Sequence, residues 1–291
     1  MHPDTDARYR RTSGAALITA RDRIVAVPEG RRAMGIPELD PVAGARLWEA
    51  LTTPITVAAA ARAAGIPEPV SEAAIRALEE CGAVELGLPV DDSNHASTPE
   101  SAGRVRPCGR MVLGITGSAQ AVFAPAYVQR LLGVFTRELD VMLTEAAQHF
   151  VLPLALSTLG ARVWTDPFSE HDASEASYQE LADEAGIVLV LPATADTIAR
   201  LALGQCDNTI SCLVAQTRAP VLVAPSMNPG MWIHPAVRHN VMRCRELGLH
   251  MLEPGLGHSV EYGRPGLGAV GFSAFGTGLI ASLRFLLEAA D

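Results

Sequence analysis

The sequence predicts two domains: a larger α/β domain built on a parallel sheet, and a small α+β domain before it. From residue 110 onward, short apolar runs typical of buried strands alternate with amphipathic helical patterns. This alternation predicts parallel strands joined by helices that cover both faces of one sheet. The segment before it has two strand patterns followed by three helical patterns. We therefore expect domains over residues 8–87 and 108–291, joined by a flexible linker over residues 88–107 that is rich in Ser, Pro and Asp.

The expected small domain begins with two short apolar runs on either side of a polar turn. Helical periodicity follows three times, Gly82 ends the last helix, and a short strand closes the domain. The expected strands cover residues 15–18, 23–27 and 83–86, and the expected helices cover residues 42–51, 57–64 and 71–81. This order of elements predicts a winged-helix-like domain.

The charge of the third helix bears on what the small domain binds. Glu72, Glu79 and Glu80 stand there against a single Arg76. Such a helix would repel the phosphates of a nucleic acid, so a peptide partner fits better than DNA. A small docking or oligomerisation module remains the alternative.

The elements of the larger domain follow from the same alternation. Its expected strands cover residues 111–115, 140–143, 187–191, 220–224 and 250–252. Its expected helices cover residues 125–139, 175–184, 196–203, 236–247 and 273–290. Each strand is a short apolar run, and each helix is amphipathic, as a three-layer domain requires.

Composition narrows the possible classes of function. Of the 291 residues, 48% are hydrophobic and 19% charged, and no apolar stretch is long enough to span a bilayer or to form a signal segment at the start. We expect a soluble, cytoplasmic protein without a membrane partner. The net charge of −9 argues against nucleic-acid binding. The five cysteines are scattered without a Cys-x-x-Cys pair, which predicts reduced thiols and no metal site.

The first strand of the larger domain ends in a Gly-Ser turn before a helix. Because Gly117 has no side chain, backbone N–H groups could approach an anion there, and the Ser118 hydroxyl could donate to it. A phosphate would fit this turn. The same pair is also typical of an ordinary strand-to-helix turn.

Two further motifs come directly after strand patterns, PATADT at residues 192–197 and PSMNPGMW at residues 225–232. Both lie at the carboxyl ends of expected strands, where ligands bind in open α/β sheets. In this order the motifs resemble the signature of the flavin-containing cysteine decarboxylases, which include the lantibiotic peptide decarboxylases and the phosphopantothenoylcysteine decarboxylases. The resemblance implies a Rossmann-like (flavodoxin-like) flavoprotein domain, FMN as cofactor, and assembly as a homotrimer or homododecamer.

The resemblance also implies which residues contact FMN. The Gly-Ser turn would hold the phosphate, residues 142–151 would lie along the ring, and the small side chains of residues 193–196 would allow close approach. The implied FMN-binding residues are Gly117, Ser118, Thr144, Phe150, Ala193, Thr194, Ala195 and Asp196. By residue type alone, Thr144 and Asp196 could instead be helix N-caps and Phe150 a core residue. Many relatives have Asn where Asp196 stands, and an ionised carboxylate cannot donate a hydrogen bond.

Asn228 is the implied catalytic residue that holds the substrate carboxylate. An amide can donate two hydrogen bonds to a carboxylate without forming an ion pair that would anchor the charge in the ground state, which suits a decarboxylase. Met227 and Trp232 would form walls of the substrate site, and a place in the core is the alternative for Trp232. The Cys-Asp-Asn stretch at residues 206–208 also matches the family and suggests a structural or subunit-contact role.

Two positions depart from the family pattern. Tyr178 stands where the family has its catalytic His, so the general base is unassigned; Tyr178 could still donate a hydrogen bond or lie against the flavin. His171 could serve as the base only if its loop folds inward. In a Gly-rich stretch that resembles the family's substrate clamp, Tyr262 and Gly263 stand where the phosphopantothenoylcysteine enzymes have Cys-Gly. Without that thiol, the reaction is expected to stop at the oxidised ene-thiol.

These observations lead to one main hypothesis. It is FMN-dependent oxidative decarboxylation of the C-terminal cysteine of a ribosomally synthesised precursor peptide, as in the biosynthesis of aminovinyl-cysteine natural products. The leader of the peptide would bind the small domain, which resembles a leader-peptide recognition element. The alternatives are an enzyme like phosphopantothenoylcysteine decarboxylase, a non-catalytic flavin-binding partner protein, and a DNA-binding regulator.

Overall fold

The structure is a computed structural model of the 291-residue chain. It describes residues 8–12, 15–19, 24–27, 34–36, 39–51, 54–86, 109–165, 178–253, 256–258 and 265–267, with positions 279, 282, 283, 286 and 287. These fall into two compact units: unit 1 spans Met1–Arg104 and Gly276–Phe285, and unit 2 spans Val105–Phe275 and Leu286–Asp291. The expected linker lies outside the described residues. Residues 276–285, which were expected in the larger domain, group with unit 1 instead.

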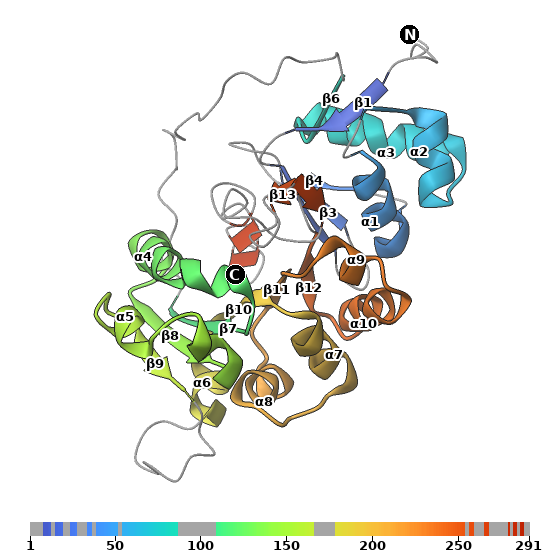
Figure 1. The fold of residues 1–291 in the computed structure, drawn as a ribbon. Coiled ribbons are helices and arrows are strands. Elements are labelled where there is room, and N and C mark those ends of the chain that lie inside the picture. The colour runs from blue at the N-terminus through green and yellow to red at the C-terminus, as the bar shows by residue number, and fades with distance from the viewer. Residues whose placement is uncertain are drawn as a thin grey trace. The chain divides into compact units, whose positions relative to one another are not determined.

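Unit 2 is built on a parallel sheet (Figure 1). Its strands are β7 (Arg110–Ile115), β8 (Glu138–Leu143), β9 (Arg162–Trp164), β10 (Ala185–Ala193), β11 (Val221–Pro225) and β12 (His250–Leu252). They lie in the order β12-β11-β10-β7-β8-β9, and each neighbouring pair is parallel. The predicted Rossmann-like sheet is confirmed.

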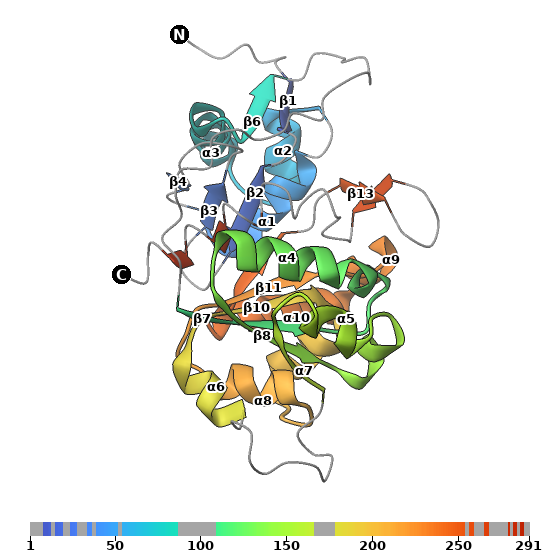
Figure 2. The same cartoon turned by 90° about the vertical axis from the view of Figure 1, so that its left-hand side faces the viewer.

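Helices cover both faces of this sheet. They are η1 (Ala119–Phe123), α4 (Ala124–Val134), η2 (Glu145–His149), α5 (Pro153–Ser157), α6 (Tyr178–Glu184), α7 (Ala195–Leu203), α8 (Thr209–Gln216), α9 (Pro229–Trp232) and α10 (Pro235–Glu246). Side chains of α6, α7, α8 and α10 share an apolar core with Val112, Val190 and Val223 of the sheet. Figure 2 shows α4 on the opposite face from α6 and α8. The sheet is therefore the middle layer of three.

Two expectations for unit 2 need correction. The helix expected over residues 125–139 is too long, because α4 ends at Val134 and a turn follows. In that turn the Thr136 hydroxyl donates to Gly109 O (2.7 Å) and accepts from Glu138 N (3.0 Å), where β8 begins. The sequence analysis also missed α8, although Asn208 and Ser211 form a reciprocal capping box at its start, and this pair is a visible N-cap signal.

Unit 1 contains the three predicted helices, α1 (Pro41–Ala50), α2 (Val57–Ala64) and α3 (Glu68–Cys81). Side chains of Asp40 and Thr56 cap α1 and α2. Gly65 and Gly82, with φ of 72° and 81°, end α2 and α3 in the left-handed conformation that glycine favours. The core of the unit includes Leu17, Leu47, Trp48 and Leu78.

The strands of unit 1 form two antiparallel groups. One group contains β2 (Ala16–Thr19), β3 (Ile24–Val27) and β4 (Met34–Gly35). In the other, β1 (Arg8–Arg11) lies between β5 (Ile55–Thr56) and β6 (Val84–Leu86). The sequence analysis did not predict β1, because the sequence RYRR has no alternation of apolar and polar residues. The winged-helix-like description of this unit stays a prediction.

Some classes of site find no support in the described part of the chain. None of its helices combines the length and the apolar character that crossing a bilayer requires. Within the same residues, no group of three or more His, Cys, Asp or Glu side chains is arranged to hold a metal ion. The described cysteines Cys81, Cys206, Cys212 and Cys244 are free thiols.

Candidate functional site

The strand order creates a topological switch point in unit 2. After β7 the chain adds β8 and β9 on one side, and then crosses back to place β10 on the other side of β7. Ligands of open α/β sheets bind in the crevice outside the carboxyl ends of the strands at such a point. The turns that follow β7 and β10 therefore define the candidate site.

The turn after β7 requires glycine at position 117. A Cβ atom added to Gly117 would lie 2.4 Å from the Ala146 Cβ and 3.2 Å from the Ala146 carbonyl carbon. Ala146 belongs to η2, which follows β8, so the two neighbouring turns pack directly against each other. Ser118 is the N-cap of η1, and its hydroxyl accepts from Gln120 N at 3.3 Å.

Thr116 joins the two sides of the switch point. Its hydroxyl donates to the Pro192 carbonyl oxygen at 2.6 Å and accepts from Thr194 N at 3.0 Å. The side chain is buried, so these bonds form away from bulk water. Thr116 was not among the predicted site residues, and the only sequence signal for it is a hydroxyl residue directly after a buried strand.

Ser226 joins the turn after β11 to the turns after β7 and β10. Its hydroxyl lies 2.7 Å from the Ser118 hydroxyl, and its backbone N–H donates to the Ala193 carbonyl at 2.8 Å. Ser226 is buried as well. The carboxyl ends of β7, β10 and β11 are thus joined by hydrogen bonds, and the sequence analysis missed this role of Ser226.

The predicted cofactor residues of the second motif begin α7. Thr194 is the N-cap, and its hydroxyl accepts from Thr197 N at 3.2 Å. Asp196 is therefore not the N-cap; its carboxylate is exposed and accepts from Arg200 Nε at 2.8 Å. Arg200 also pairs with Asp207 and lowers the pKa of that carboxyl through the hydrogen bond. Ala193 is fully buried, so its contribution at this site is made by its backbone.

Thr144 and Phe150 flank η2. Thr144 is the N-cap, and its hydroxyl accepts from Ala147 N at 3.2 Å while its backbone N–H donates to Ile115 O at 3.1 Å. Phe150 is 41% exposed, so the alternative of a core Phe is wrong. An exposed aromatic ring next to these turns is available to a planar ligand.

Asn228, two residues after Ser226, is the N-cap residue of α9. Its carbonyl accepts from Met231 N and Trp232 N at 2.9 and 3.1 Å, while its side chain makes no capping bond within the described part of the chain. Met227 is partly buried against the core. Trp232 lies in that core with the Arg238 guanidinium 5.3 Å from its ring centroid, as the core alternative proposed.

Tyr178 is the first residue of α6 and packs, partly buried, against the core between the helices and the sheet. His171, Tyr262 and Gly263 lie outside the described residues. The strands on either side of Tyr262, β13 (Leu256–His258) and β14 (Pro265–Leu267), pair antiparallel, and β14 lies beside α9. The hairpin that carries the expected substrate clamp is therefore next to the helix that Asn228 begins.

These residues fit a flavin nucleotide. The turn of residues 116–118 carries no charge, and the Ser118 hydroxyl at its end leads into the N–H groups at the start of η1. Such a turn suits an anionic phosphate. The exposed ring of Phe150 at the neighbouring turn suits the planar ring system of the flavin.

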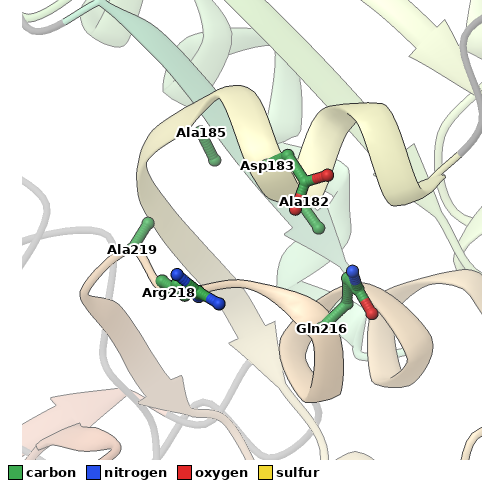
Figure 3. A pocket seen from close by; sticks show the side chains of 6 residues that line it. All are labelled: Ala182, Asp183, Ala185, Gln216, Arg218 and Ala219. Atoms are coloured by element: carbon green, nitrogen blue, oxygen red, sulfur yellow. The ribbon is translucent and has the colours of Figure 1, made fainter.

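A hollow of unit 2 lies at another edge of the sheet. It measures about 710 Å³ and is lined by Ala182, Asp183, Ala185, Gln216, Arg218 and Ala219. Figure 3 shows it between α6, which carries Asp183, and Gln216 at the end of α8. Ala185 and Ala219 stand at the amino ends of β10 and β11, so the hollow is at the edge opposite the switch point. The candidate site is still assigned to the switch point, because the buried and hydrogen-bonded polar groups lie there.

Comparison with known proteins places the same region in a protein family. Residues 99–269 match the model of the flavoprotein family. The coenzyme A biosynthesis bifunctional protein CoaBC of Mycobacterium bovis is 36% identical over 149 residues, which are 51% of this chain and 35% of that protein. The protein of the same name from Bacillus subtilis is 34% identical over 149 residues. The chain thus spans about a third of the length of these curated relatives.

Two solved structures resemble the fold. The FMN-dependent cysteine decarboxylase SpaF is 26% identical with a TM-score of 0.52, and the match covers 65% of this chain and 99% of SpaF. A PPC decarboxylase complexed with pantothenoylaminoethenethiol is 25% identical with a TM-score of 0.54, and the match covers 63% of this chain and all of that one.

Proposed function

Because the chain belongs to the flavoprotein family, we propose that it is an FMN-dependent enzyme that oxidatively decarboxylates the C-terminal cysteine of a ribosomally made precursor peptide. One observation carries this proposal. At the switch point the Thr116 hydroxyl accepts from Thr194 N, and the Ser118 and Ser226 hydroxyls share a hydrogen bond, so the turns after three strands are joined. Asn228 follows Ser226 by two residues. Similarity to the cysteine decarboxylase SpaF supports the type of reaction.

The residues of the switch point have separate tasks in this proposal. Ser118 and the first N–H groups of η1 hold the phosphate, and Thr144 and Phe150 lie at the ring. Thr194 and Ala195 keep the start of α7 small enough for a flat molecule to approach. Bound FMN supplies the acceptor for a hydride from the cysteine Cβ.

Asn228 orients the substrate carboxylate in this proposal. Its amide is neutral and can donate two hydrogen bonds, so it positions the carboxylate without stabilising its charge as an ion pair would. The carboxylate can then leave as CO2 into apolar surroundings that include Met227. The β13–β14 hairpin next to α9 would exclude water from the bound peptide end.

The direct test is incubation of the full chain with a Cys-terminated peptide, followed by mass spectrometry. The expected product has lost CO2 and two hydrogens. Asn228→Asp should lower kcat by about 10²–10³-fold, because one donor to the reacting group becomes a repelling carboxylate, and it should still bind FMN. Asn240→Asp on α10 is the matched control and should react like the wild type. Full activity of Asn228→Asp would remove Asn228 from the mechanism.

The N-terminal unit supports a peptide substrate. β6 is at the edge of the group β5-β1-β6 and follows α3 directly. An edge strand can accept a further strand from a peptide, and Glu79 and Glu80 on α3 are exposed. We expect removal of the leader to raise KM with little change in kcat. Equal KM values with and without leader would contradict recognition by this unit.

A PPC decarboxylase-like enzyme is the second candidate, and the 36% identity to CoaBC favours it. Tyr262, in place of the Cys of the phosphopantothenoylcysteine enzymes, disfavours it. Turnover of phosphopantothenoylcysteine to a saturated amine product would select this candidate. Bound FMN without turnover of either substrate would select the non-catalytic partner protein, which Tyr178 suggests.

We also propose a homotrimer or homododecamer in the cytoplasm. Support for assembly comes from exposed apolar side chains of unit 2, which occur in or near η1, η2 and α5: Val122, Phe150, Leu152 and Leu154. Such exposure is typical of surfaces that another protein covers. Mass photometry of the full chain tests the oligomeric state, and a monomer at micromolar concentration would contradict it.

A further inference from the structure

Gln120 is a buried polar residue that the sequence analysis did not single out. It is 4% exposed and lies two residues after Ser118, in η1. Its backbone N–H donates to the Ser118 hydroxyl at 3.3 Å. Its side-chain oxygen Oε1 is buried and finds no hydrogen-bond partner in the described part of the protein.

The position of Gln120 connects this oxygen to the candidate site. η1 begins at the turn after β7 and lies against β10, so it stands at the crevice between these two strands. Buried polar atoms of native proteins almost always have a partner, because an unmet hydrogen bond in the interior is unfavourable. A bound molecule that supplies a donor at the crevice would meet this need.

We propose that Gln120 is a cofactor-binding residue whose side-chain carbonyl accepts a hydrogen bond from a hydroxyl of the polyol chain of FMN. This inference rests on the proposed FMN site. The phosphate that Ser118 would hold offers only acceptor oxygens, and a carbonyl oxygen needs a donor. The polyol chain is the part of FMN next to the phosphate, and its hydroxyls are donors. The ring, at the other end of the polyol, is further from the turn that contains both Ser118 and Gln120.

Gln120→Met tests the proposal, since methionine has a similar length but no amide. Apoprotein would be titrated with FMN, with riboflavin, and with lumiflavin, which lacks the polyol and the phosphate, and the quenching of flavin fluorescence would be measured. We expect about tenfold weaker binding of FMN and riboflavin, which corresponds to one lost hydrogen bond to a ligand hydroxyl, and unchanged binding of lumiflavin. The melting temperature of the apoprotein should stay the same or rise, because the substitution removes a buried acceptor.

Gln216→Met is the matched control, because Gln216 is exposed at the opposite edge of the sheet; it should bind all three flavins like the wild type. Unchanged FMN binding by Gln120→Met overturns the inference. Equal weakening for lumiflavin would place the contact at the ring, and a lower melting temperature of the apoprotein would indicate a structural role; either result also overturns it. Wild-type protein that binds no flavin would refute the proposed function first.

Discussion

Polar side chains that join turns are buried at the carboxyl edge of the unit 2 sheet, and polar side chains around a hollow are exposed at its amino edge. At the carboxyl edge, Thr116 and Ser226 are buried and joined to neighbouring turns. At the amino edge, Asp183 and Arg218 are exposed around a hollow of about 710 Å³. The polar side chains around this hollow are open to solvent, so they need no ligand to satisfy them. Buried hydroxyls and an unpartnered buried amide oxygen mark a ligand site better than the size of an opening does.

One ion pair at each edge tests this difference between the edges. Arg245 pairs with Glu253 just after β12, and both side chains are at most 4% exposed. Arg110 pairs with Glu184 before β10, and the Glu184 side chain is 60% exposed. Arg245→Met should lower the free energy of unfolding by about 3–5 kcal/mol, because it removes the cation that faces a buried carboxylate. Glu184→Gln should cost at most about 1 kcal/mol.

Urea denaturation of both variants measures the difference. Equal losses for the two pairs would show that the carboxyl edge is no more sensitive to a lost partner than the amino edge.

The second test concerns the close packing of the first turn. Gly117→Ala would press a methyl group against Ala146, whose backbone as well as side chain is within 3.2 Å. We expect a loss of about 1–3 kcal/mol from overpacking, together with weaker FMN binding because the turn must move. Gly133→Ala in α4 is the control, since its added methyl group meets no described atom within 4 Å; it should stabilise the protein by about 0.5–1 kcal/mol. Thermal denaturation with and without FMN measures both effects.

The third test removes the link across the switch point. Thr116→Val deletes the hydroxyl that accepts from Thr194 N, at an expected cost of about 1–2 kcal/mol. The expected loss of stability is modest because the Pro192 carbonyl keeps a second donor, Thr116 N, at 3.3 Å. Thr116→Ser keeps the hydroxyl and should recover most of the loss. A serine variant as unstable as the valine variant would mean that the methyl group, and not the hydrogen bond, is what matters.

Local patterns in the sequence predict much of the fold. The helix α2 was predicted from its periodicity with the bounds that the structure shows. In the structure Thr56 caps it and Gly65 ends it, so both of its ends are set within one short segment. The strands around the switch point were predicted because each is a continuous apolar run, and Gly117 and Ser118 were identified because they follow such a run.

Apart from α8, whose capping signal is local, the features that the sequence analysis missed depend on tertiary structure. The Ser118 and Ser226 hydroxyls are 108 residues apart in the chain, and Thr116 and Pro192 are 76 apart. β1 is a polar run that becomes a strand because β5 and β6 lie on either side of it. Gln120 stands out only once its burial and its unpartnered oxygen are known. No local periodicity carries this information.

The return of Gly276–Phe285 to unit 1 has a consequence for how this protein could evolve. The fully buried Leu279 and Leu283 belong to this returning segment. A recombination event that exchanged only the first hundred or so residues would leave these leucines facing a foreign surface. Unit 1 should therefore diverge by point substitution more readily than by exchange of the whole N-terminal segment. Chimeras should take Gly276–Phe285 from the same parent as the N-terminal segment.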